Sequence, residues 1–299
     1  MFERILVPLD GSAAAESALP YAEEIAARSG ADLILFSVCD PDALGMENLY
    51  RSYLEHVAER VQRELPAWGA QKEQSVLREV ALGHPAVEIL EYAEENKVSL
   101  IVMATRGGSA GGTWSLGNIA SKVLQDADKP VLLVREPPDE AKIQERRLFK
   151  RILVPLDASE RGGAVVLVTE VLARITGADL TLFHVLEPPP ALVAAVPGAE
   201  FSYIPFSADE EARRASSAIE YLDRIEKTLK KAGVEVSSEV SSGSAAAEIL
   251  RYAEAHEVDL IAMSTHGRSA IGRWVFGSVT EKVLHAAKTS VLIARSFPD

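Results

Sequence analysis

The second half of the chain contains a glycine-bearing loop, "STHGRSAIGRWVFGS", whose residue types and spacing suit the binding of a phosphate group. Nine residues separate Gly267 from Gly277, and Ser278 follows at the start of a segment with helical periodicity. The N-terminus of a helix attracts phosphate oxygens, glycine allows close backbone approach, and a serine hydroxyl donates one more hydrogen bond. Arg268 and Arg273 could balance part of a polyphosphate charge, or could be solvated loop cations.

The first half carries a similar loop, "ATRGGSAGGTWSLGN", with the same nine-residue spacing between Gly107 and Gly117. Asn118 takes the place of the closing serine, and no cation stands between the two glycines. Neither loop contains the P-loop lysine motif or a GxGxxG fingerprint. Glycines alone would equally suit a turn that binds nothing. From the residues present we expect the second loop to be the better phosphate site.

An aspartate follows the first apolar run of each half, Asp10 in "ILVPLDGS" and Asp157 in "ILVPLDAS". In open parallel sheets, ligands bind beyond the carboxyl ends of the strands, where the strand order reverses. A carboxylate at that place could accept hydrogen bonds from ribose hydroxyls, or it could only help the chain to turn. Both interpretations stay open at this point.

The elements that would position these residues occur twice. "RILVPLD" begins at Arg4 and again at Arg151, an offset of 147 residues, whereas "EILEYAEENKVSLIVMATRG" from Glu88 matches "EILRYAEAHEVDLIAMSTHG" from Glu248 at an offset of 160. The second half therefore has 160 − 147 = 13 additional residues, within the proline-rich stretch 187–209. That stretch could cover a nucleotide, contact another subunit or fold back on its own domain.

Each half alternates short apolar runs with longer segments of helical periodicity, which is typical of parallel strands covered by helices on both faces. In the first half, strands are expected at 5–8, 33–38, 75–82, 100–103 and 131–134. The expected fold is α/β, with two doubly wound, five-stranded, Rossmann-like parallel-sheet domains in tandem. We expect the domains at residues 1–135 and 151–299, with the polar stretch 136–150 as a linker.

The composition of the chain limits the classes of binding partner and the cellular compartment that we expect for the protein. The net charge of −13 opposes broad binding to nucleic acids or to anionic membranes. One cysteine, Cys39, and six scattered histidines predict neither a disulfide framework nor a zinc site. The start of the chain lacks a signal-peptide pattern, and no apolar run has the length of a membrane span. We therefore expect a cytoplasmic protein that has no membrane partner.

The motifs "ILVPLDGS", "ILVPLDAS" and "STHGRSAIGRWVFGSVTEKVLHAAKTSVLIAR" resemble those of the universal stress protein family, and the resemblance covers both halves. It implies a tandem two-domain member with an adenine nucleotide alpha hydrolase-like fold and with ATP, with or without magnesium, as the cofactor. In the second half the implied ligand residues are Asp157 at the ribose, Val185 at adenine, and Gly267, Arg268, Gly277 and Ser278 at the phosphates. In the first half they are Asp10, Val38, Gly107, Gly117 and Asn118.

Two positions depart from the family pattern. The first loop glycine of the family is Ala104 in one half and Ser264 in the other, so a side chain stands where the family usually has none. His184 and His266 have no acid or nucleophile partner in the sequence, and we interpret them as polar neighbours of the site.

The leading hypothesis is an ATP-binding regulatory protein of the stress response. The alternatives are a stress scaffold that binds no nucleotide and acts through protein contacts, and a slow ATPase. Hydrolysis would need a held metal and a positioned nucleophile, and we predict no catalytic or metal-ligating residues. The resemblance further implies that the last strands, 130–134 and 290–294, pair within the chain as a pseudo-dimer. Whether two chains then form a homodimer stays open.

Overall fold

The computed structural model describes residues 2–41, 45–70, 74–105, 116–159, 163–188, 207–265 and 276–295. The strands of the first half are β1 (Arg4–Pro8), β2 (Asp32–Cys39), β3 (Val76–Leu82), β4 (Leu100–Ala104) and β5 (Val131–Val134). Those of the second half are β6 (Arg151–Pro155), β7 (Asp179–Leu186), β8 (Val236–Ser242), β9 (Leu260–Ser264) and β10 (Ser290–Ala294). The strands expected from the apolar runs are therefore present in both halves.

Helices connect these strands in each half. The first half contains α1 (Ala13–Glu16), α2 (Leu19–Ser29), α3 (Met46–Glu64), the short 3-10 helix η1 (Leu65–Trp68), α4 (Pro85–Glu95) and α5 (Asn118–Asp126). The second half contains α7 (Gly163–Thr176), α8 (Ala208–Lys231), α9 (Ala245–Ala255) and α10 (Ser278–Ala286), and α6 (Glu140–Gln144) lies between the halves. Local sequence explains several boundaries: α2 ends where Gly30 takes a left-handed conformation with φ 78°, and α8 begins with a capping box between Ser207 and Glu210.

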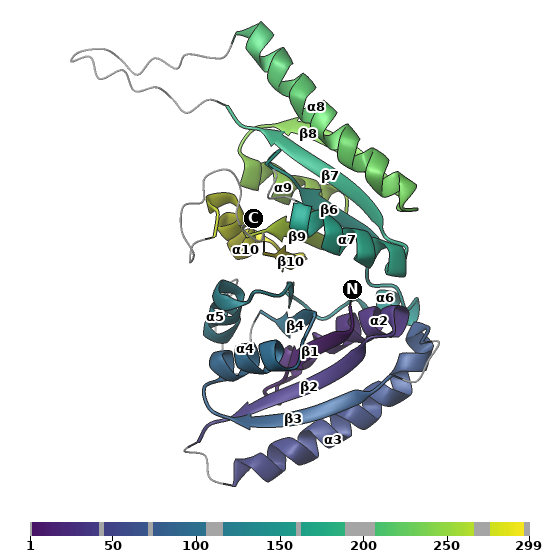
Figure 1. The fold of residues 1–299 in the computed structure, drawn as a ribbon, viewed down its shortest axis with the longest axis vertical. Coiled ribbons are helices and arrows are strands. Elements are labelled where there is room, and N and C mark those ends of the chain that lie inside the picture. Colours follow the sequence, from purple (N-terminus) through teal and green to yellow (C-terminus); the bar gives the residue numbers. More distant parts are fainter. Residues whose placement is uncertain are drawn as a thin grey trace, which may run out of the picture.

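All the strands join one ten-stranded sheet in the order β3-β2-β1-β4-β5-β10-β9-β6-β7-β8. Neighbours within each half are parallel, whereas β5 and β10 are antiparallel, with Leu133 opposite Val291 and Val131 opposite Ile293. The expected α/β fold is confirmed (Figure 1). The expected pairing of the last strands joins the two halves. In each half the strand order reverses beside the first strand, between β1 and β4 and between β6 and β9.

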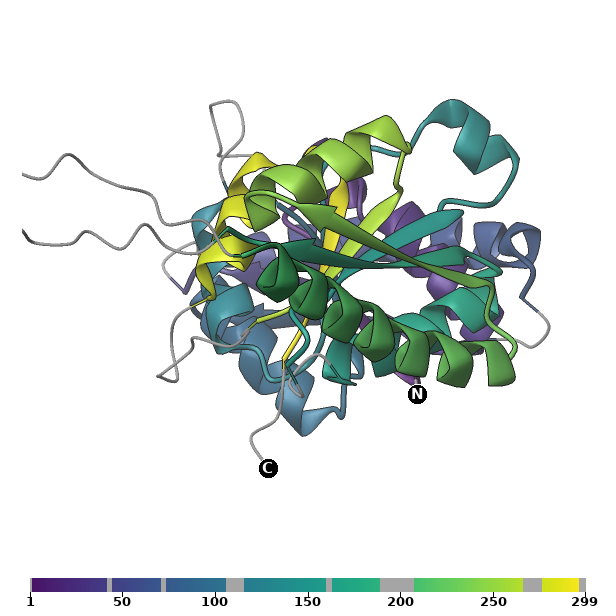
Figure 2. The same ribbon diagram turned by 90° about the horizontal axis from the view of Figure 1, so that it is seen from above.

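Helices cover both faces of this sheet. On one face lie α2, α3, α7 and α8, and on the other lie α4, α5, α9 and α10 (Figures 1 and 2). Each face buries a cluster of apolar side chains, and each cluster contains residues from both halves. Because the two halves share both cores and one sheet, we expect them to unfold together.

The segment 136–150, expected as a linker, is packed against both halves. Leu148 and Phe149 are buried, and the Phe149 ring meets the edge of Tyr21 with 5.6 Å between the ring centroids. The backbone N–H of Leu148 donates to the buried Glu24 carboxylate at 2.7 Å. The start of this segment is polar and contains prolines, whereas its end supplies buried residues to the core.

The turn after the first strand of each half contains a left-handed residue. The φ angle is 82° at Gly11 and 60° at Ala158. In both turns the preceding aspartate accepts a hydrogen bond from the serine backbone N–H two residues later, at 3.0 Å. The geometry is therefore the same, but an alanine in this conformation costs about 1 kcal/mol that a glycine does not.

We expect Ala158→Gly to raise the free energy of unfolding by up to about 1 kcal/mol, because it removes this backbone strain. The matched change Gly11→Ala should lower it by about 1 kcal/mol. A Cβ atom at Gly11 would have nothing within 4 Å, so only the backbone angle decides the result. Urea unfolding of the two variants measures both effects, and a loss of stability in Ala158→Gly would contradict the strain argument.

Candidate functional site

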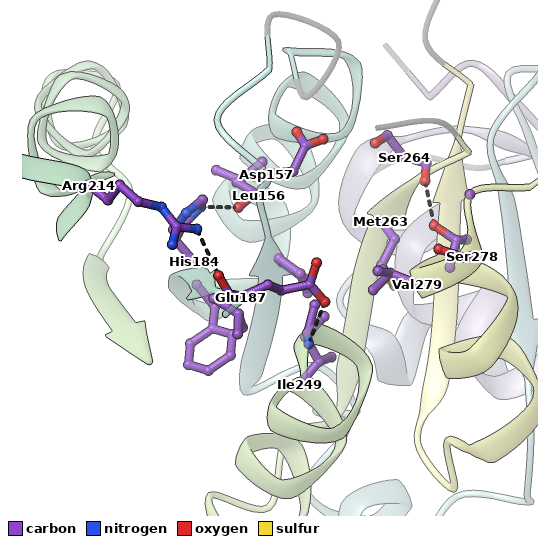
Figure 3. Close-up of a pocket in the computed structure, with 16 residues that line it drawn as sticks. Leu156, Asp157, His184, Glu187, Arg214, Ile249, Met263, Ser264, Ser278 and Val279 are labelled. Atoms are coloured by element: carbon purple, nitrogen blue, oxygen red, sulfur yellow. Dashed lines mark hydrogen bonds between the residues drawn. The ribbon is translucent and has the colours of Figure 1, made fainter. Parts of the chain in front are cut away.

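A cavity of about 260 Å³ lies at the carboxyl end of the second half's strands (Figure 3). It sits at the place where the strand order reverses, which is the usual ligand position in such sheets. The ends of β6, β7 and β9, the starts of α9 and α10, and α8 all contribute to its lining. The expected residues that line it are Asp157, Val185, Ser264, Gly277 and Ser278. Separate parts of the chain thus bring these residues together.

The start of α10 forms one wall of the cavity. Gly277 precedes the first helical residue, and its N–H donates to the Thr265 carbonyl at 3.0 Å. The Thr280 hydroxyl donates to the Ser264 carbonyl at 3.1 Å, which holds the end of β9 against the helix. Within the described residues, no side chain caps the first turn of α10. The positive end of the helix therefore faces the cavity with backbone donors that suit an anion.

Asp157 also lines this cavity. Its Oδ1 atom accepts hydrogen bonds from the Ser159 backbone N–H at 3.0 Å and from the Ser159 hydroxyl at 2.6 Å. The Ser159 carbonyl in turn accepts from the Tyr221 hydroxyl at 3.3 Å, so α8 supports the turn. Asp157 thus helps to turn the chain and also lines the cavity, and the two alternatives for its role do not exclude each other.

The opposite wall is polar, and two of its residues, Glu187 and Arg214, belong to none of the sequence motifs. Arg214 of α8 donates to the Glu187 carbonyl at 2.8 Å, and the Glu187 carboxylate accepts from the Ala245 N–H at the start of α9, at 3.1 Å. His184, expected as a polar neighbour of the site, is buried and bonds through Nδ1 to the Leu156 carbonyl at 2.7 Å. Figure 3 shows Arg214 and His184 on one side of Asp157, with Ser264 and Ser278 on the other. Arg214 belongs to no motif, and only the three-dimensional packing of α8 brings it here.

The floor of the cavity is apolar. Phe183, Ile249 and Met263 line it, and the Phe183 ring packs on Tyr252 with 4.8 Å between the ring centroids. An apolar floor with a few fixed polar groups at the rim is typical of a small-molecule site. A flat aromatic base could pack on this floor while its polar substituents meet the rim.

The first half repeats the frame with different side chains. Gly117 precedes α5 as Gly277 precedes α10, and its N–H donates to the Thr105 carbonyl at 2.8 Å. Ser37 bonds to the Leu9 carbonyl at 2.7 Å, where the second half uses His184. Asn118 stands at the first helical position in place of a serine.

The equivalent position in the first half is also more open. Asp10 is exposed whereas Asp157 is half-buried, and Val38 and Val185 are both half-buried. Ile119 in α5 is 42% exposed, whereas its counterpart Val279 is partly covered. A ligand would therefore meet less protein surface in the first half.

Several predicted residues lie outside the described residues. They are Gly107, His266, Gly267, Arg268, Arg273 and most of the stretch 187–209. In the part of the chain that the structure describes, no group of three histidine, cysteine, aspartate or glutamate side chains could hold a metal ion. No described helix is both long and apolar enough to cross a membrane.

Comparison with known proteins links both halves to one family. The model of the Universal stress protein family matches residues 1–135 and 148–295. A universal stress protein of Thermus aquaticus is 40% identical over 141 residues, which cover 45% of this chain and 100% of that protein. One from Synechocystis is 24% identical over 318 residues and covers 98% of this chain and 100% of its own length.

Solved structures support the same fold. The crystal structure of a universal stress protein from Archaeoglobus fulgidus superposes with a TM-score of 0.69 at 21% sequence identity. The superposition covers 99% of this chain and 100% of that one. The tandem arrangement therefore recurs in a relative of similar length.

Proposed function

Because the chain belongs to the universal stress protein family, with one match to the family in each half, we propose that it is an ATP-binding regulatory protein of the stress response. Its second half supplies the better nucleotide site. The observation that supports this proposal is the cavity at the carboxyl end of the second half's strands. It is lined by residues from three separate segments of the sequence: Asp157, Val185, and the pair Gly277 and Ser278. Nucleotide occupancy would then alter the shape or the contacts of the protein.

The lining suggests how the parts of a nucleotide would be held. The adenine ring would pack on the floor formed by Phe183, Ile249 and Met263 and meet the backbone at Val185. Asp157 would accept hydrogen bonds from ribose hydroxyls, and the phosphates would lie at the start of α10, near the Ser278 hydroxyl. Magnesium would bind chiefly through phosphate oxygens and water, since the described lining of the cavity contains just two carboxylates, Asp157 and Glu187, and Asp157 would bind the ribose.

The asymmetry between the halves favours the second site. Ser278 offers a hydroxyl and Thr280 fixes the end of β9, whereas the first half has Asn118 and Ala120 at these positions. Asp157 is half-buried and Asp10 is exposed, and burial strengthens a hydrogen bond from a carboxylate. At most we expect slow hydrolysis of bound ATP.

A matched pair of loop variants tests the proposal. Gly277→Glu places a carboxylate where the phosphates would lie, and we expect the affinity for a fluorescent ATP analogue to fall at least tenfold. Both Gly277 and Gly117 have negative φ angles, −58° and −64°, so neither position needs the left-handed backbone that favours glycine. Gly117→Glu in the first half is the control, and we expect it to leave the tighter binding phase unchanged.

The measurement is an equilibrium titration of the full chain, with unfolding curves to verify that each variant folds. Equal loss in both variants would contradict the ranking of the two sites. A wild-type chain without saturable binding would overturn the nucleotide proposal and favour the scaffold that acts through protein contacts.

A further inference from the structure

Two arginines exchange contacts across the junction of the halves. Arg135 follows β5 in the first half and donates through Nη2 to the Leu284 carbonyl in the last turn of α10. Arg295 follows β10 in the second half and donates through Nη1 to the Ala127 carbonyl at the end of α5, at 3.1 Å. Each half therefore holds a helix of the other.

These contacts supply a hydrogen-bond donor and a positive charge to the carboxyl end of each helix. The last four carbonyls of a helix have no partner within the helix, and the helix dipole makes this end negative. In its own last turn α5 has no basic residue, and α10 has only His285. An arginine satisfies the carbonyls and also supplies the favourable charge.

The helices held in this way are the two that face the candidate nucleotide sites. The first turn of α10 begins at Ser278 in the cavity, and the first turn of α5 begins at Asn118. With nine residues, α10 is about 13 Å long at 1.5 Å per residue, so a contact that anchors its carboxyl end also fixes the position of its amino end.

Each of the two arginines follows a residue whose carbonyl is hydrogen-bonded to the start of the loop in its own half. The Thr105 N–H, which precedes the first-half loop, donates to the Val134 carbonyl beside Arg135 at 2.9 Å. The equivalent bond in the second half joins the Thr265 N–H to the Ala294 carbonyl at 3.1 Å, beside Arg295. In each half, therefore, one backbone hydrogen bond connects the threonine at the start of the loop to the residue that precedes the arginine, and this arginine contacts a helix of the other half.

We propose that Arg135, supplied by the first half, is a positioning residue for the nucleotide site of the second half. It anchors the carboxyl end of α10 and adds positive charge along the axis of that helix, and so the amino end is held where it can meet phosphates. This inference rests on the proposed nucleotide site. It assigns to the first half a role in that site even when the first half binds nothing itself.

Three variants test the role of Arg135, in a Gly117→Glu background that leaves only the second site to measure. We expect Arg135→Met to raise the Kd of the fluorescent ATP analogue about threefold to tenfold, since one charge at the far end of a short helix is removed. The Kd of adenosine, which has no phosphate, should change less than twofold. Arg135→Lys keeps the charge and should recover most of the affinity. The matched variant Arg295→Met removes the equivalent contact at α5. Because Arg295 adjoins Ala294, which is hydrogen-bonded to Thr265 of the second half, we expect a change of the second-site Kd smaller than that caused by Arg135→Met.

Amide hydrogen exchange supplies a readout that needs no nucleotide. Arg135→Met should accelerate exchange in α10, and Arg295→Met should accelerate it in α5, each without effect on the other helix. Equal changes of the second-site Kd in both methionine variants, or equal loss of ATP and adenosine affinity, would overturn the inference. If the wild-type chain binds no nucleotide, the proposed function and the role toward phosphate both fail, and exchange still reports whether Arg135 holds α10.

Discussion

Replacing Asp259 by alanine is expected to lower the free energy of unfolding by about 3 kcal/mol, because it leaves buried donors without an acceptor. The Asp259 side chain is 4% exposed. One of its oxygens accepts the backbone N–H groups of Lys150 and Arg151, both at 2.8 Å, and the other accepts the Lys142 ammonium at 2.5 Å. A single carboxylate thus joins the start of β6, helix α6 and the start of β9.

The first half offers a matched control for this prediction. Ser99 occupies the equivalent position and accepts the backbone N–H groups of Glu3 and Arg4 at 2.9 and 3.2 Å. Because this hydroxyl is neutral and holds no ammonium group, Ser99→Ala should cost about 1 kcal/mol. Asp259→Ser copies the first half into the second and should give an intermediate loss. Urea unfolding followed by circular dichroism measures all three, and equal losses in Asp259→Ala and Ser99→Ala would contradict the prediction.

Glu23 is expected to make the protein less stable as the pH rises. It is buried in α2 and accepts a hydrogen bond from the Trp68 indole at 2.8 Å. Burial disfavours the charged carboxylate and raises the pKa of Glu23 to about 7 from an ordinary value of 4.5, although the Trp68 bond opposes the shift. Between these values the folded chain keeps a proton that the unfolded chain has released.

The sign of the effect follows from this proton. The stabilising contribution of protonated Glu23 is fully present below pH 4.5 and is lost as the pH rises through about 7. For a shift of this size the loss is about 3 kcal/mol, since each pKa unit corresponds to about 1.4 kcal/mol. Glu24, whose pKa burial also raises to about 7, acts in the same direction.

Glu23→Gln isolates the contribution of one carboxyl group. A glutamine oxygen can still accept the Trp68 bond, but the side chain stays neutral at every pH. We expect the variant to gain stability relative to the wild type as the pH rises from 5 to 8, by up to about 3 kcal/mol. The difference between the two proteins cancels the titration of other groups. Parallel stability curves over this range would show that Glu23 does not carry the proton.

The fold was predictable from the sequence because the alternation of short apolar runs with segments of helical periodicity occurs twice in the chain. The apolar runs at β1, β2, β4 and β5 mark buried parallel strands, and their second copies lie 147 residues further on for β1 and β2 and 160 residues further on for β4 and β5. The burial of the end of the linker was not predictable in the same way. Leu148 and Phe149 form an apolar pair too short to carry a period, and their burial depends on contacts with Tyr21 and Glu24 far away in the sequence.

Residues of the candidate site were predictable where they belong to a recognisable sequence motif. Asp157 and Gly277 belong to motifs with characteristic neighbours, and both line the cavity. Arg214 enters through the packing of a long helix, and the bonds of Arg135 and Arg295 span 149 and 168 residues of sequence. Contacts of that kind follow from the assembled fold, and residue spacing does not indicate them.

The antiparallel pairing of β5 with β10 inside one chain also frees the protein from two constraints of assembly. A dimer of separate copies dissociates on dilution, whereas a short tether keeps its two partners at a fixed, high effective concentration. A homodimer must also carry every residue twice, once in each copy. Here each member of an equivalent pair can change alone, as the pairs Ser37 and His184, and Ser99 and Asp259, illustrate. One half is thereby free to specialise in binding while the other serves as its scaffold.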